Sequence, residues 1–109
     1  MNLNTLYSAL IESAKAGEPL LTVRELTALL YLHLHQRTGR RTGEIADALH
    51  ICKGAASRAI SGLEGKGYVS NKRDADDFRR NFVTLTIAGQ KYLDRLEARL
   101  APAKTKAAA

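Results

Sequence analysis

The side chains with the clearest chemical role in this sequence are the cations between positions 37 and 82. That stretch carries ten Lys and Arg against six Asp and Glu, a net charge of +4, whereas residues 1–36 sum to −1. Clustered arginine and lysine bind phosphate groups, and a sequence pI near 9.8 in a chain of 109 residues favours a polyanionic partner. A solvated charged surface has the same composition, so the predicted elements must decide between the two.

Other kinds of chemistry find little support in the residues. A single cysteine, Cys52, excludes an intrachain disulfide and a cysteine-rich zinc site. His33 and His35 are two apart on a predicted helix, so they point to different sides. Arginines crowd the acidic residues at 74–77, and no glycine-rich phosphate loop follows a strand. We expect no catalytic site, cofactor or metal, and two alternatives stay open for Cys52: an oxidant sensor or a small buried filler.

Hydrophobic periodicity predicts five helices and one hairpin. Thr22 and Glu25 have the spacing of a capping box, and Thr42 and Thr86 are the expected N-caps of two later helices. Gly67 stands where a helix ends in a left-handed residue. The predicted helices cover about residues 3–16, 23–36, 43–49, 53–66 and 86–100, and the strands begin at Tyr68 and Asn81.

The order of these elements is that of a winged helix-turn-helix. A short third helix, a three-residue break and a longer fourth helix are followed by a hairpin, whose polar connection at 72–80 is the expected wing. We therefore predict a mainly α fold with a small β-hairpin, forming one domain over residues 1–100. Residues 101–109 are expected to be a disordered tail.

From about Leu21 to Gly89 the sequence resembles the MarR family of bacterial winged-helix regulators. Two segments are similar to the family's third helix and recognition helix, Thr42-Gly43-Glu44-Ile45-Ala46 and Ala55-Ala56-Ser57-Arg58. The run Leu63-Glu64-Gly65-Lys66-Gly67-Tyr68-Val69 is similar to the exit from that helix into the wing. The most specific likeness is to the family's Asp-x-Arg wing signature and the Leu-Thr-x-x-Gly after it, here Asp77-Phe78-Arg79, Val83, Leu85-Thr86 and Gly89.

The resemblance and the chemistry of the residues together predict DNA contacts from three places. The fourth helix, 53–66, is expected to read the major groove with residues off its apolar face: Lys53, Ala55, Ser57, Arg58 and Ser61. The wing is expected to reach the flanking minor groove and phosphates through Lys72, Arg73, Asp77, Arg79 and Arg80. At the start of the third helix, an open hydroxyl and two cations are expected to bind a phosphate: Arg40, Arg41 and Thr42.

The two ends of the chain are the expected dimer interface. Their apolar stripes are too long for a small winged domain to cover alone, and exposed stripes of this kind mark interfaces. The N-terminal stripe comprises Leu3, Leu6, Tyr7, Leu10 and Ile11, and the C-terminal one comprises Leu93, Leu96 and Leu100. Two protomers would then place two recognition helices on an inverted-repeat operator.

These features predict a sequence-specific regulator that binds double-stranded DNA as a homodimer and represses transcription. One alternative is a plasmid or phage DNA-binding factor for replication, partition or packaging. A second is a winged helix used for protein interaction, against which the basic segment argues. With no apolar run of membrane-span length and no signal-peptide pattern, the protein is expected in the cytoplasm without membrane contact. The operator and any small-molecule effector are left open.

Overall fold

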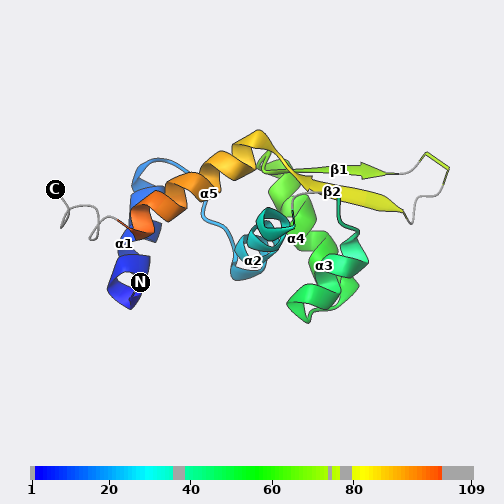
Figure 1. Cartoon of the computed structure of the whole chain (residues 1–109), viewed down its shortest axis with the longest axis horizontal. Helices are drawn as coiled ribbons and strands as arrows, with labels where there is room; N and C mark the ends of the chain where they lie inside the picture. The colour runs from blue at the N-terminus through cyan, green and yellow to red at the C-terminus, as the bar shows by residue number, and fades with distance from the viewer. Residues whose placement is uncertain (1, 36–38, 74, 77–79, 102–109) are drawn as a thin grey trace. The chain divides into compact units, whose positions relative to one another are not determined.

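A computed structural model describes residues 2–35, 39–73, 75–76 and 80–101 (Figure 1). It confirms the mainly α fold with one hairpin, and every predicted element is present. The chain divides into two compact units. One is Leu21–Gln90, and the other is formed by the two chain ends, up to Leu20 and from Lys91 onward. The elements in chain order are α1 Leu3–Lys15, α2 Val23–Leu34, α3 Thr42–Leu49, α4 Lys53–Gly65, β1 Val69–Arg73, β2 Asn81–Leu85 and α5 Ile87–Leu100.

In the unit Leu21–Gln90, α4 packs against α2, α3 and β1. This packing gives one apolar core, which removes the inward faces of three short helices from water. Gly67 ends the α4 segment with φ +80°, the predicted left-handed conformation. The largest fully buried side chains of this core are Leu29, Ile45, Ile60, Leu63 and Val83.

A capping box and an ion pair join the start of α2 to the end of α4. The Thr22 hydroxyl accepts from the Glu25 amide, and Glu25 Oε1 accepts from the Thr22 amide at 2.8 Å, as the spacing predicted. Glu25 Oε2 also accepts from Lys66 Nζ at 3.1 Å. A Cβ atom at Gly62 would lie 2.1 Å from Glu25 Oε2, so this approach of the carboxylate requires a glycine there.

The hairpin is antiparallel, with Val69 opposite Leu85 at its base and Arg73 opposite Asn81 toward its tip. An additional bridge extends it: the Arg40 amide donates to the Val83 carbonyl at 3.0 Å, and the Val83 amide donates to the Arg40 carbonyl at 2.8 Å. Sequence periodicity did not predict this bridge. It fastens the segment before α3 to the middle of β2.

The junction between β2 and α5 explains the Leu-Thr-x-x-Gly pattern. Thr86 Oγ1 accepts from the Gly89 amide at 3.1 Å, which confirms Thr86 as the N-terminal cap. The same hydroxyl donates to the Gly67 carbonyl at 2.7 Å. A Cβ atom at Gly89 would lie 2.2 Å from the Tyr68 carbonyl oxygen, so only glycine fits against the turn after α4.

Ion pairs and a hydrogen bond hold the two chain ends to each other. Arg99 Nη1 donates to Ser13 Oγ and to Glu18 Oε1, both at 2.7 Å, and Arg95 also pairs with Glu18. Burial raises the pKa of Glu18, but the hydrogen bonds and charges of Arg99 and Arg95 outweigh it and leave that pKa below its usual value. Among the described residues, no helix is both long and apolar enough to cross a membrane. The expected tail falls outside the described residues from 102 onward.

Candidate nucleic-acid interface

The face of α4 that points away from the core carries four of the five predicted reading residues. Lys53, Ser57, Arg58 and Ser61 are all exposed. The helix begins at an N-cap formed by Cys52, whose Sγ accepts from the Ala55 amide at 3.4 Å. Before it, His50 ends α3 in the left-handed conformation with φ 56°, which makes the turn of the helix-turn-helix.

The predicted place of Ala55 on the exposed face of α4 is wrong. Its exposed fraction is 3%, because α4 packs on two sides, against α2 as well as α3, and its buried face is therefore wider than the spacing of Ala56, Ile60 and Leu63 indicated. Ala55 belongs to the core and lies beside the start of α2, so only its exposed neighbours form the reading face.

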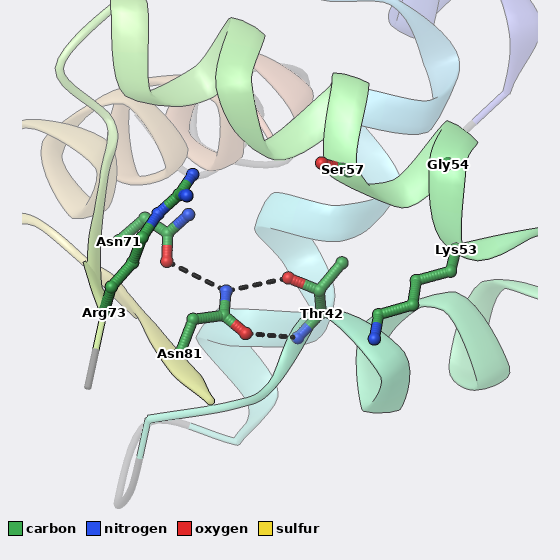
Figure 2. Close-up of a pocket in the computed structure, with 7 residues that line it drawn as sticks. All are labelled: Thr42, Lys53, Gly54, Ser57, Asn71, Arg73 and Asn81. Carbon is green, nitrogen blue, oxygen red and sulfur yellow. Dashed lines mark hydrogen bonds between the residues drawn. The ribbon is translucent and has the colours of Figure 1, made fainter. Parts of the chain in front are cut away.

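A hollow of about 360 Å³ lies between α4, the start of α3 and the hairpin (Figure 2). Two cations line it, Lys53 from the first turn of α4 and Arg73 from the end of β1. Its other lining residues are polar or glycine: Thr42, Gly54, Ser57, Asn71 and Asn81. A polar concavity with two cations from different elements has the chemistry that binds anionic oxygen atoms.

Asn81 forms the centre of the hydrogen bonds in this hollow, as Figure 2 shows. Its Nδ2 donates to Thr42 Oγ1 at 2.7 Å and to Asn71 Oδ1 at 2.9 Å, and its Oδ1 accepts from the Thr42 amide at 3.3 Å. These bonds join α3, β1 and β2. Sequence reasoning missed Asn81; the available signal was an asparagine opening a strand otherwise rich in β-branched and aromatic residues, where asparagine is disfavoured.

The predicted open phosphate site at the start of α3 needs correction. Arg41, with extended backbone, is the N-cap, and Thr42 is the first helical residue, with a hydroxyl already bonded to Asn81. Glu44 Oε1 accepts from the Arg41 amide at 2.9 Å, and Glu44 Oε2 lies 3.5 Å from Arg40 Nη1. The Arg41 amide keeps the pKa of Glu44 below its usual value, although partial burial opposes this. A carboxylate therefore occupies the helix N-terminus, while Arg41 itself is exposed.

A second hollow, of about 250 Å³, lies on the opposite side of α4 against the start of α2. Arg24 and Arg58 both line it, together with Thr22, Glu25, Ala55 and Ala59. Arg24 is exposed and was not among the predicted site residues, because its own segment of the sequence is not basic. Cations therefore line hollows on both sides of α4.

Cys52 is exposed, so the alternative of a small buried filler is wrong. The Ala55 amide, together with the charges of Arg58 and Arg24, lowers the pKa of its thiol below the usual value, although desolvation opposes this. Its function as an oxidant sensor stays a prediction. Within the described part of the chain, no group of three or more His, Cys, Asp or Glu side chains is placed to hold a metal ion.

The wing is described only in part. Lys72, Arg73 and Arg80 are exposed, as expected for phosphate contacts. Asp77 and Arg79, which carry the Asp-x-Arg resemblance, lie outside the described residues.

The chain ends place the predicted dimer residues in three settings. Leu3 and Tyr7 are 82% and 67% exposed. Leu93 and Leu96 are both buried within the single chain, at 5% exposed, so their assignment to a surface stripe is wrong. The remaining four are half-buried: Leu6, Leu10, Ile11 and Leu100.

Comparisons with known proteins point to one family. The model of the MarR family matches residues 21–80. A mutant of Staphylococcus aureus MepR bound to an oligodeoxyribonucleotide is 24% identical, covering 96% of this chain and 74% of that chain, with TM-score 0.78. YusO from Bacillus subtilis is 20% identical, covering 94% and 70%, with TM-score 0.74. A Thermotoga maritima transcriptional regulator is 19% identical, covering 94% and 69%, with TM-score 0.74. No curated protein matches the chain.

Proposed function

This chain belongs to the MarR family and has the winged-helix fold of its transcriptional regulators, and we propose that it binds double-stranded DNA and represses transcription from an inverted-repeat operator. The observation that carries the proposal is the exposed face of α4, flanked on both sides by hollows lined with cations. It is a DNA-binding protein in this proposal and not an enzyme.

The geometry supports separate roles for the residues that contact bases and the residues that contact the DNA phosphates. Arg58 and the small residues Ser57 and Ser61 are exposed along α4, so the helix backbone has room to approach base edges in the major groove. Lys53 lies in the first turn of the helix and Arg73 lies on the hairpin, and both line the same hollow. The phosphate backbone at the edge of the major groove would pass along this hollow. Phosphate contacts supply affinity, and Arg58 supplies base preference.

The similar structures support DNA as the partner. One is a MepR mutant bound to an oligodeoxyribonucleotide, and MepR is a transcription regulator of a multidrug efflux pump. We propose that residues 1–100 act as one DNA-binding domain whose end helices pair two protomers through surfaces that include the exposed Leu3 and Tyr7. Because its partner would be genomic DNA, the proposed site of action is the cytoplasm.

Selection of bound duplexes from a random-sequence pool tests this function, with sedimentation of the protein alone and with the selected duplex. The expected result is an enriched inverted repeat with half-sites about one helical turn apart, roughly 34–36 Å, bound by two protomers. Recovery of duplexes without a shared sequence, or an 11.9 kDa monomer in both states, would contradict the dimeric repressor. Sequence-independent binding by a monomer would favour a role in replication or packaging.

A further inference from the structure

The side chain of Asn81 has no amide hydrogen left for DNA, although it lies at the centre of the wing-side hollow. A primary amide carries two N–H donors. In this structure one donates to Thr42 Oγ1 and the other to Asn71 Oδ1, and the amide oxygen accepts from the Thr42 backbone. A group whose donors are all used within the protein acts on a phosphate only through other residues.

The side chain of Asn81 bonds to two residues of separate elements, Thr42 and Asn71. Thr42 starts α3, which packs against α4, the helix that begins at Lys53. Asn71 lies two residues before Arg73 on β1, and Asn81 itself pairs with Arg73 across the hairpin. The hydrogen bonds of Asn81 therefore connect β1, which carries Arg73, to α3, which packs against the helix that begins at Lys53.

We propose that Asn81 is a positioning residue for DNA binding, which ties the base of the wing to the start of α3 so that the cations of α4 and β1 engage one duplex together. The inference rests on the proposed function. Phosphates on a duplex are at fixed separations, so cations from two elements bind them jointly only if those elements are held in a fixed relation. Two backbone hydrogen bonds between Arg40 and Val83 also fasten β2, but they lie nearer its middle than its tip-side end.

Replacing Asn81 with alanine removes all three bonds and deletes no Lys or Arg side chain. A residue that does not touch the ligand but couples two binding sites changes the binding free energy by about 0.5–2 kcal/mol. For the selected duplex this corresponds to a roughly 2- to 30-fold loss of affinity. The slope of log affinity against log salt should also become shallower by about 0.9 for each phosphate that the variant no longer neutralises. A purely structural role would lower the folded fraction but would not change the slope of the folded protein.

Variants of Thr42 give an independent test of the same connection. Thr42→Val removes the hydroxyl that accepts from Asn81 and should reproduce the shallower slope, whereas Thr42→Ser keeps the hydroxyl and should restore it. The Asn81→Ala, Thr42→Val double variant should lose less affinity than the two single variants added together, because both break the same bond. Thr84→Ala is the matched control, an exposed residue of the same strand outside the hollow, and it should bind as the parent does.

The outcomes separate this inference from the proposed function. If the parent binds no duplex, the proposed function fails. Suppose that the parent binds and that a thermal transition shows Asn81→Ala to be folded. If this variant has the parental affinity and slope, the positioning role is overturned while DNA binding stands. If Asn81→Ala does not fold, Thr42→Val decides: a parental slope overturns the inference, and a shallower slope restored in Thr42→Ser supports it.

Discussion

Gly62→Ala is expected to destabilise the protein although alanine is the better helix former. A Cβ atom at position 62 would lie 2.1 Å from Glu25 Oε2 and 3.2 Å from Glu25 Cδ, so the carboxylate must move. That carboxylate is buried and accepts from Lys66 Nζ at 3.1 Å. A hydrogen bond to a charged group contributes about 1.5–3 kcal/mol, and the gain in helix propensity offsets about 0.5–1 kcal/mol of that contribution. The net expected decrease in the free energy of unfolding is therefore about 0.5–2.5 kcal/mol.

Gly65→Ala, three residues further along the same helix, is the matched control. A Cβ atom there meets nothing within 4 Å, so only the propensity gain of about 0.5–1 kcal/mol applies. Urea denaturation should shift the two midpoints in opposite directions at an unchanged m-value. Equal stabilisation by both substitutions would refute the reasoning, because Glu25 would then have moved away without cost.

Three further predictions concern acid stability, base reading and the chain ends. Burial raises the pKa of Glu25, but hydrogen bonds from Thr22 and Lys66 outweigh it and leave that pKa below its usual value. Its stabilisation is therefore complete above that value and is lost as the pH falls through the folded pKa, so Glu25→Gln should flatten the acid side of a stability curve measured by urea unfolding. Arg58→Ala should cost about 1–3 kcal/mol on the selected duplex and relax base preference in a repeated selection; unchanged selectivity would remove Arg58 from the reading face. Tyr7→Asp should weaken dimerisation in sedimentation with the thermal transition retained, whereas Leu93→Asp should unfold the chain; a dimer unaffected by Tyr7→Asp would place the interface elsewhere.

Periodic features of the fold could be predicted from the sequence, and single long-range contacts could not. The helices follow from repeated apolar spacing, and the Thr22 and Thr86 caps follow from local residue types. The Arg40–Val83 bridge pairs a single residue outside the hairpin, Arg40, with β2. A single paired residue leaves no periodic signal in the sequence. Alanine suits either a buried or an exposed position, so the burial of Ala55 depended on a second packing partner that spacing alone does not reveal.

In the candidate site, too, exposure could be predicted from local sequence, whereas a long-range hydrogen bond could not. The exposure of Lys53 and Arg58 followed from their places off the apolar face of α4. The side chain of Asn81 reaches Thr42, 39 residues away in the sequence, so no local pattern predicts the bond. The same bond explains why Thr42 is not the open hydroxyl expected at the helix start.

Titration of the labelled, selected duplex with the protein at several salt concentrations tests the central claim most directly, that the cation-flanked α4 is a DNA-binding surface. If four phosphates are neutralised by each protomer, by Lys53, Lys72, Arg73 and Arg80, log affinity should fall linearly with log salt at a slope of about −3.6 per protomer. Fluorescence anisotropy measures this slope. Absence of binding at low salt, or an affinity that does not change with salt, would contradict the account.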